Sequence, residues 1–257
     1  MSLSITAIAC LTYPETFHMV CTMKWEPILK NYPDDTEQIQ LARKIYELTH
    51  DALQAVDIPE LDSALKNEDI LTSLDYAPLA KACREVWQRI FEIEPDVDME
   101  LAIDAFIRDE ALPELSDENQ DLVVMFVRPA VTMYLTKLRE KNSDSLKPSH
   151  NSGECPFCLA YPRIAFDSEN SRRLSCLLCG QEWDFKRIKC PYCGNNDHET
   201  LGYFEAEGIE GVKVYYCDQC KYYIKVVDTE KREVLDAETE DILTLIMDEV
   251  AQQEGYK

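Results

Sequence analysis

The stretch RIKCPYCGNNDHET, from Arg187 to Thr200, contains two cysteines three positions apart, Cys190 and Cys193. Two intervening residues let a chain turn over a metal ion so that both sulfurs face it. The glycine that follows, Gly194, can adopt a positive φ without steric cost. This short stretch therefore predicts a metal-binding turn.

The same spacing occurs four times within 66 residues. Eight thiolates would make two complete tetrahedral sites with four sulfur ligands each. Pairing in sequence order joins the first turn with the second across 17 residues, and the third with the fourth across 23. Known ligand spacings favour this order over an interleaved, cross-braced one. The predicted metal ligands are Cys155, Cys158, Cys176, Cys179, Cys190, Cys193, Cys217 and Cys220.

Such sites accept either zinc or iron, since both metals take tetrahedral sulfur ligation. Four protein ligands leave no position for water, so metal-activated hydrolysis is not expected. The turns lack the strand-to-helix context of a thioredoxin motif and the tighter cysteine runs of ferredoxins. We expect the metals to support the fold, a binding surface or electron transfer.

Composition narrows the possible partners. The 257 residues carry a net charge of −23, which opposes binding to nucleic acids or anionic membranes. The first twenty residues lack Lys and Arg, so no basic signal-peptide start is present. The longest apolar stretch, 122–135, is interrupted by Arg128 and Pro129 and is too short to span a bilayer. We therefore expect a cytoplasmic protein with reduced thiols and no stable membrane insertion.

The cysteine pattern divides the chain. Residues 140–154 are polar and rich in Ser, Asn, Pro and Gly, as linkers are, and all four cysteine pairs follow them. Glycine is absent before Gly153, which disfavours tight strand turns. We predict an α+β protein with an all-helical domain, two CxxC…CxxC modules and a C-terminal helix. The expected limits are 1–147, 148–187, 188–235 and 236–257.

Apolar spacing supports helices before the linker. Leu79, Cys83, Val86, Trp87 and Ile90 would line one helix face. A second helix is expected to begin near Thr36, with its apolar face at Leu41, Ile45 and Leu48, and a third to run from Asp117 towards Lys141 with a kink or break at Pro129.

After the linker the apolar period becomes two. Short aromatic or β-branched runs at 182–189, 201–206, 212–217 and 222–227 predict strands. From residue 238 the helical period returns, with Ile242, Leu245, Ile246 and Val250 on one side. Between residues 152 and 227 nine basic side chains nearly balance eleven acidic ones, so the negative charge lies mostly elsewhere.

Other chemically active side chains fit ordinary structural roles. Cys83 lies on an apolar helix face, and Cys10 and Cys21 also look like core residues. His198 is expected in an exposed loop, and His150 adds nothing to a site that four cysteines already fill. No catalytic constellation is found, so we do not expect an enzyme.

Two sets of side chains have open roles. The basic residues Arg172, Arg173, Lys186, Arg187 and Lys189 could offset thiolate charge or form a docking patch. Six tyrosines of the second module should mostly pack it, although exposed ones could anchor a partner. These are Tyr192, Tyr203, Tyr215, Tyr216, Tyr222 and Tyr223.

The chain from Cys155 onward resembles the FdhE family of formate dehydrogenase accessory proteins. The resemblance rests on the four CxxC pairs in this order and on the runs CLLCGQEW, RIKCPYCG and VYYCDQCKYYIKV, followed by an acidic helix ending in QEGY. It covers about two fifths of the chain. Leu159 and Lys221 stand where the first and fourth turns would otherwise have glycine.

The resemblance implies a helical domain followed by two rubredoxin-like, zinc-ribbon-type modules with the eight cysteines as ligands of two metal ions. It also implies a cytoplasmic role in maturation, through binding of the molybdenum- or tungsten-containing catalytic subunit of formate dehydrogenase. Two alternatives stay open, namely a rubredoxin-like iron redox carrier or sensor and a zinc-ribbon nucleic-acid binder using the basic patch. The sequence does not indicate the oligomeric state.

Overall fold

The structure is a computed structural model that describes residues 23–62, 70–108, 110–112, 115, 117–143 and 153–257. The chain forms two compact units, which meet in the sequence between Asn142 and Ser143. Cys10, Cys21 and His150 lie outside the described residues. Each unit is described below by itself.

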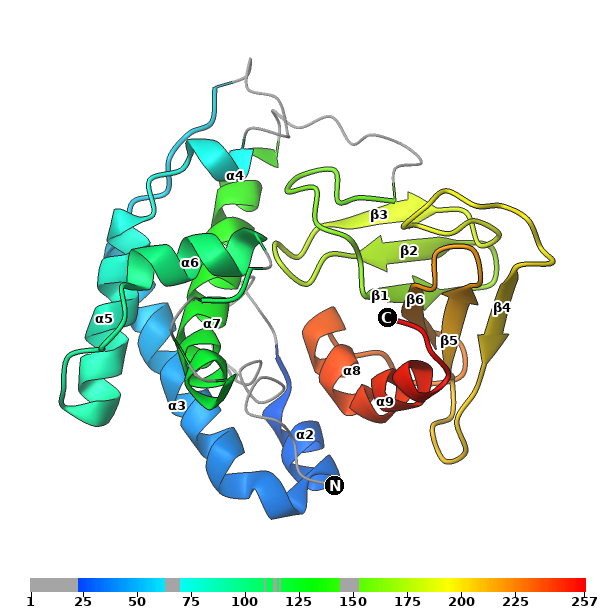
Figure 1. The fold of residues 1–257 in the computed structure, drawn as a ribbon, viewed down its shortest axis with the longest axis horizontal. Helices are drawn as coiled ribbons and strands as arrows, with labels where there is room; N and C mark the ends of the chain where they lie inside the picture. The colour runs from blue at the N-terminus through cyan, green and yellow to red at the C-terminus, as the bar shows by residue number, and fades with distance from the viewer. Residues whose placement is uncertain (1–22, 63–69, 109, 113–114, 116, 144–152) are drawn as a thin grey trace. The chain divides into compact units, whose positions relative to one another are not determined.

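The first unit is helical throughout its described residues (Figure 1). Helices α3, α5, α6 and α7 pack against one another around an apolar interior. The described elements are α2 (Trp25–Asn31), η1 (Pro33–Asp35), α3 (Thr36–Ala52), η2 (Leu53–Ala55), α4 (Ile70–Ser73), α5 (Ala77–Phe91), α6 (Met99–Arg108) and α7 (Asp117–Lys141).

The apolar face predicted for α5 is the buried one. Leu79, Cys83, Val86 and Trp87 are buried, and Ile90 is half-buried at the end of the helix. The Trp87 ring packs between Phe91 of the same helix and Phe126 of α7, with ring centroids 4.8 Å away in both cases. Aromatic contacts of this kind make α5 part of the core of the unit.

Helix α3 begins at Thr36, as predicted, but its buried face differs from the predicted one. Ile45 is buried, whereas Leu41 and Leu48 are only half-buried. The deepest face instead carries Ile39, Ala42, Ile45, Tyr46 and Thr49. The neighbouring helices cover the face of α3 that carries Tyr46 and Thr49. Packing therefore decides which face is buried, and that face is not the one with the most apolar side chains.

Helix α7 is one element of 25 residues, with Pro129 inside it rather than at a break. The ring of Pro129 removes one backbone N–H from the helical ladder. Residues on both sides, including Phe126, Val127, Ala130 and Val131, are fully or almost fully buried. This packing can offset the missing hydrogen bond, since tertiary contacts supply most helix stability.

The second unit contains one six-stranded sheet in the order β3-β2-β1-β6-β5-β4. The strands are β1 (Ile164–Asp167), β2 (Arg172–Ser175), β3 (Glu182–Phe185), β4 (Leu201–Phe204), β5 (Val212–Cys217) and β6 (Tyr223–Asp228). Four of them fall on the four runs predicted from the sequence. The pair β1 and β2 forms a hairpin between the first two cysteine turns.

The sheet is built from two copies of one pattern. Each copy runs turn, strand, strand, turn, strand, with antiparallel pairing inside the copy. The two copies join where β1 and β6 pair in parallel, with Ile164 opposite Lys225 and Asp167 opposite Asp228. The two CxxC…CxxC modules therefore share a single sheet.

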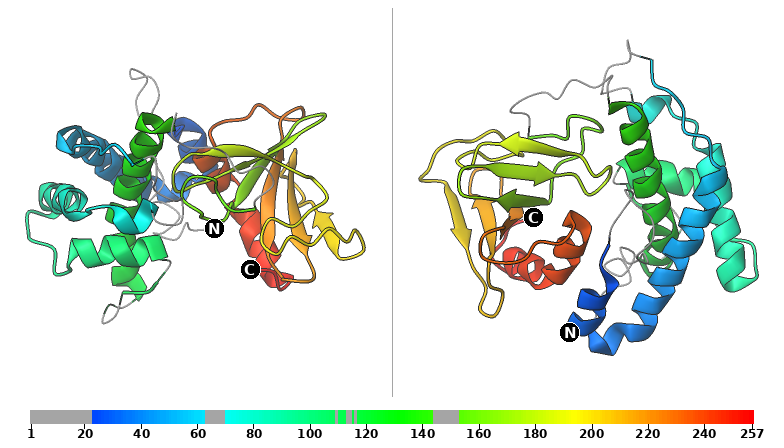
Figure 2. Two further views of the ribbon diagram at one scale, coloured as in Figure 1. Left: turned by 90° about the horizontal axis from the view of Figure 1, so that it is seen from above. Right: turned by 180° about the vertical axis from the view of Figure 1, so that it is seen from behind.

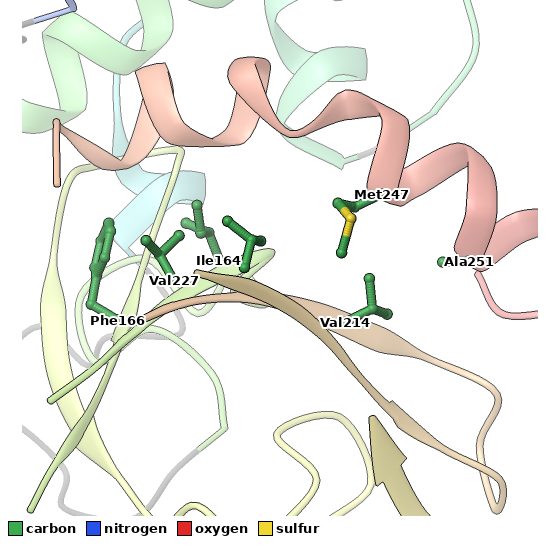
Figure 3. Packing of buried hydrophobic residues seen from close by; sticks show 7 residues of the cluster. Ile164, Phe166, Val214, Val227, Met247 and Ala251 are labelled. Carbon is green, nitrogen blue, oxygen red and sulfur yellow. The ribbon is translucent and has the colours of Figure 1, made fainter. Parts of the chain in front are cut away.

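One face of this sheet is covered by two short helices, α8 (Ala237–Leu243) and α9 (Leu245–Gln253) (Figures 1 and 2). A single C-terminal helix was predicted, but Thr244 leaves the helical conformation and separates the two. The break changes the predicted apolar side, so that Met247 and Ala251 are the most buried residues of α9, whereas Val250 is only half-buried. Figure 3 shows Met247 and Ala251 above Ile164, Val214 and Val227 of the sheet.

A buried lysine also joins the helices to the sheet. Lys225 of β6 is fully buried, and its Nζ lies 2.6 Å from carboxylate oxygens of both Asp241 in α8 and Asp248 in α9. The Tyr223 hydroxyl donates a hydrogen bond of 2.6 Å to Oδ1 of Asp248. The guanidinium of Arg163 lies 3.8 Å from the same oxygen. Two cations thus balance two carboxylates at this boundary.

The architecture confirms the predicted α+β class, with helices first, the cysteine-containing sheet next and helices at the C-terminal end. Among the residues that the structure describes, none of the helices combines the length and apolar character that crossing a bilayer would take.

We predict that Lys225→Met lowers the free energy of unfolding by about 3–5 kcal/mol, because it removes the buried cation from both carboxylates and leaves only the exposed Arg163, 3.8 Å from Asp248. Chemical denaturation at constant metal loading measures the change. Lys231→Met is the control, because Lys231 is exposed and lies 3.8 Å from Asp228; its effect should stay within about 0.5 kcal/mol. Equal losses in the two variants would contradict a structural role for the buried lysine.

Candidate metal centres

The four cysteine turns have the same backbone geometry. In each, the N–H of the residue after the second cysteine donates to the carbonyl oxygen of the first. The N–H of the first cysteine donates to the carbonyl oxygen one residue further along. All eight hydrogen bonds measure between 2.7 and 3.0 Å. This repeated turn brings the two sulfurs of each pair to the same side of the chain.

The residue after each second cysteine adopts a positive φ. The angle is 68° at Gly180 and 75° at Gly194, where the sequence supplies glycine. It is 61° at Leu159 and 63° at Lys221, so these two turns keep the geometry without glycine. A side chain in this region costs about 1–2 kcal/mol. The geometry of the turn therefore prevails over the residue preference.

The first cluster joins the first two turns. The Sγ of Cys155 lies 3.5 Å from that of Cys179, and the Sγ of Cys158 lies 3.5 Å from those of Cys176 and Cys179. All four side chains are buried. Their separation is far longer than a disulfide bond, and none of the described cysteines is oxidised to one.

The second cluster joins the third and fourth turns. Cys190 and Cys220 bring their sulfurs within 3.6 Å, and Cys193 and Cys217 within 3.7 Å. Here Cys193 is exposed and Cys220 is half-buried, so this cluster reaches the surface of its unit. The grouping in both clusters is the sequential one.

The donor sets fit a tetrahedral metal ion. A metal with metal–sulfur bonds of about 2.3 Å would separate its sulfurs by about 3.8 Å. The observed contacts of 3.5–3.7 Å are close to that value, and the ligand atoms of each cluster all lie within 4.8 Å of one another. Two four-cysteine clusters compatible with metal ions are thus present, and either zinc or iron would suit them.

The local environment affects how readily each thiol ionises. Hydrogen bonds from the other three cysteines lower the pKa of Cys155, whereas burial raises the pKa of Cys179. Burial also raises the pKa of the Cys217 thiol, but hydrogen bonds from the Asn195 amide and from backbone N–H groups outweigh it and bring the pKa to about 7. Each cluster thus has one thiol that is most easily converted to the thiolate that a metal requires.

Asn195 is a supporting residue that the sequence reasoning did not identify. Its side-chain Nδ2 lies 3.5 Å from the Sγ of Cys217 and 2.8 Å from the hydroxyl of Thr200. Its main-chain carbonyl oxygen accepts a hydrogen bond from the N–H of Cys190. Neighbouring donors of this kind orient metal ligands. Its position just after Gly194 was the available signal, because that residue must complete the turn.

The remaining candidates occupy different surroundings. Cys83 is buried in the helical unit, and burial raises the pKa of its thiol to about 12, as suits a core residue. His198 is exposed in the loop before β4. Among the basic residues, Arg172 is buried and Arg173 is exposed, so they do not form one continuous surface.

The tyrosines pack in stacks beside the second cluster. Tyr192, inside the third turn, stacks on Tyr161 at 5.1 Å and on Tyr222 at 4.5 Å between ring centroids. Its hydroxyl donates to the carbonyl oxygen of Pro162 in the first module. The stack therefore connects residues near three of the four turns.

The chain is similar in sequence to known proteins. Residues 188–257 match the family described as FdhE, C-terminal domain. The Protein FdhE homolog of Aquifex aeolicus is 23% identical over 259 residues, covering 90% of this chain and 89% of that protein. Protein FdhE of Escherichia coli O1:K1 is 31% identical over 107 residues, covering 40% of this chain and 34% of its own length.

The fold also matches a solved structure. The crystal structure of the FdhE protein from Pseudomonas aeruginosa superposes with a TM-score of 0.62 over 99% of this chain and 94% of that one, at 18% sequence identity. The two chains therefore have the same fold.

The positive φ of the turns predicts opposite effects at two matched positions. Gly194→Ala should lower the free energy of unfolding by about 1 kcal/mol, since there is space for the added methyl group and only the backbone is strained. Lys221→Gly should raise the free energy of unfolding by a similar amount. The gain should be slightly smaller, because the variant loses the exposed ion pair between Lys221 and Asp218. Denaturation with Asn196→Ala as the control measures both changes. A stabilising Gly194→Ala would contradict the strain argument.

The difference in burial predicts that a chelator removes metal from the protein in two steps. The second cluster should lose its ion several-fold faster, because Cys193 and Cys220 admit solvent. Release followed with a chromogenic chelator should therefore have two phases. Cys193→Ser should change the fast phase, and the matched Cys158→Ser the slow one. A single phase, or the reverse assignment, would contradict this order.

Proposed function

Since the chain belongs to the FdhE family, we propose that it is a non-enzymatic accessory protein that binds the catalytic subunit of formate dehydrogenase and assists its maturation. In this proposal the eight clustered cysteines hold two metal ions, and the metal-bound sheet forms the recognition surface. The protein acts in the cytoplasm on an unfinished partner and does not bind nucleic acid.

The observation that carries the proposal is the position of the second cluster. It lies at the surface of its unit with Cys193 exposed, whereas the first cluster is buried completely. A closed site with four cysteines has no open ligand position for catalysis. A metal so close to the surface can instead fix the backbone that a partner contacts. Residues 188–257, which match the family, contain this cluster in full.

Charge supports a protein partner rather than a nucleic acid. The net charge of −23 would repel phosphates over most of the surface. Electrostatic complementarity governs which partner approaches and at what rate. An acidic protein whose binding face is locally less acidic would distinguish among partner proteins by their charge.

A redox carrier or sensor is the second candidate. The second cluster is partly exposed, and its sulfur atoms receive hydrogen bonds from Asn195 and from the backbone. Both features tune the potential of iron–sulfur sites. Iron in this cluster would give visible absorption that bleaches reversibly on reduction, whereas a colourless protein with stoichiometric zinc would exclude this candidate.

The proposed function predicts the outcome of an anaerobic pull-down from the native host. The tagged protein should recover a formate dehydrogenase catalytic subunit, and Cys190→Ser/Cys193→Ser should lose it together with formate dehydrogenase activity. Cys83→Ser is the control, because Cys83 is buried in the helical unit and belongs to neither cluster. Normal formate dehydrogenase activity in the double variant, at normal protein levels, would contradict the proposal.

A further inference from the structure

A cavity of about 150 Å³ lies beside the second cluster. Most of its strand residues point away from α8 and α9, because Val212 and Val214 face those helices and side chains alternate along β5. Part of its wall comes from the cluster itself. Its apolar lining includes Ile188, Pro191, Leu201, Tyr203, Tyr215 and Ile224, and Cys190 and Cys217 also line it.

The cavity is suited to one bulky apolar side chain. A cavity of about 150 Å³ is large enough to hold a benzene ring. Of the large apolar side chains that stand exposed on the described residues of this unit, three line it, namely Ile188, Tyr203 and Tyr222. Exposed aromatic and aliphatic groups gathered around a hollow are typical of an interface anchor.

Basic side chains line the cavity together with Cys190 and Cys217, whose cluster of four thiolates would carry a net charge of −2 around a divalent metal. Its positive charges come from Arg172, Arg187 and Lys189, and none of the described residues that line it carries a carboxylate. The chain as a whole has 49 acidic residues against 26 lysines and arginines. These three basic side chains favour carboxylates on an occupant where it passes beside them.

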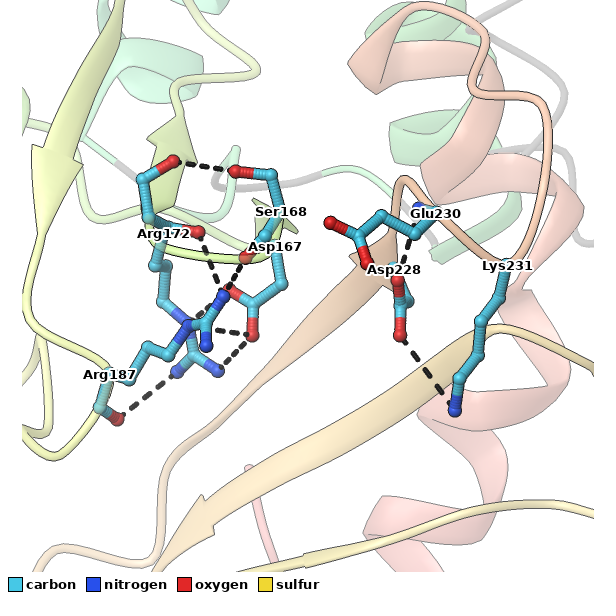
Figure 4. A network of polar contacts seen from close by, with 8 residues as sticks. Asp167, Ser168, Arg172, Arg187, Asp228, Glu230 and Lys231 are labelled. Atoms are coloured by element: carbon cyan, nitrogen blue, oxygen red, sulfur yellow. Dashed lines mark hydrogen bonds and ion pairs between the residues drawn. The ribbon is translucent and has the colours of Figure 1, made fainter.

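One carboxylate, that of Asp167, offsets only part of this positive charge. Arg172 donates to both oxygens of Asp167, at 2.8 and 2.9 Å, and the guanidinium of Arg187 lies 3.6 Å from the same carboxylate (Figure 4). One carboxylate for two guanidinium groups leaves a net positive charge at this side of the cavity. Arg172 also lies over the Tyr215 ring, 4.1 Å from its centroid, which fixes the ring that lines the cavity.

We propose that this cavity binds one bulky apolar side chain of an acidic peptide segment of the partner. The apolar side chain would enter the hollow between Ile188 and Tyr203, and flanking carboxylates would face Arg187 and Lys189. The second cluster would hold Cys190 and Cys217, and with them the wall of the cavity, in place. The inference deepens the proposed function and rests on it for the identity of the partner.

A synthetic peptide tests the cavity without assuming that partner. The probe is Glu-Asp-Phe-Asp-Glu, labelled with a fluorophore and titrated against the full chain as purified with its metal. We expect saturable binding that weakens with salt. Replacing Phe by Ala, or the four acidic residues by Lys, should weaken it at least tenfold. A basic peptide that binds as well as the acidic one would overturn the proposal.

Two exposed isoleucines provide a matched pair of variants. Ile188→Asp places a carboxylate at the cavity and should weaken peptide binding at least tenfold. Ile93→Asp makes the same change at a side chain of equal exposure in the helical unit, 62% against 65%, and should leave binding unchanged. Equal binding to both variants would overturn the proposal. So would a change of oligomeric state in Ile188→Asp alone, since the cavity would then be occupied by a second copy of this chain.

The pull-down separates this inference from the proposed function. Loss of the formate dehydrogenase subunit with Ile188→Asp, but not with Ile93→Asp, would support both. Capture by Ile188→Asp and by the unaltered protein alike would refute the cavity and leave the proposed function intact. Specific peptide binding at the cavity, with no formate dehydrogenase captured by the unaltered protein, would support the cavity and refute the proposed function.

Discussion

The second unit depends on the convergence of four sulfurs in each cluster, at separations that would suit one metal ion. Strands of four to six residues bury little apolar surface, so the hairpins alone cannot offset the entropy of ordering their chains. Metal ligation supplies folding free energy to modules of this kind. A bound metal would offset the strain of the positive φ at Leu159 and Lys221.

The second constraint is the junction between the two copies of the module. Parallel pairing of β1 with β6 makes one sheet wide enough to bury Ile164, Val214 and Val227 beneath Met247. Lys225 lies on the same face, where Asp241 and Asp248 compensate its charge. A buried pair of this type contributes little net stability but penalises other arrangements, since any shift would leave a charge unpaired. The junction therefore fixes the position of the helices on the sheet.

The parts of this fold that follow from local chemistry could be predicted from the sequence. The CxxC spacing indicated the four turns, and alternating β-branched residues indicated four of the strands. The parallel pairing of Ile164 with Lys225 joins residues 61 positions apart and leaves no local pattern. The break at Thr244 and the burial of Lys225 also depend on packing against the sheet, so neither could be read from periodicity. Asn195 was missed for the same reason, because its partner Cys217 lies in another turn.

The two modules differ in their surroundings but have the same turns. The first cluster has four buried cysteines, whereas the second exposes Cys193 and borders a cavity lined by Ile188, Tyr203 and basic side chains. If both clusters only supported the sheet, they would not need to differ in burial. Burial would protect a metal in the first cluster from exchange. The exposed Cys193 would leave a metal in the second cluster less protected. Such an asymmetry is understandable if the first cluster maintains the fold and the second positions a surface that a partner must reach.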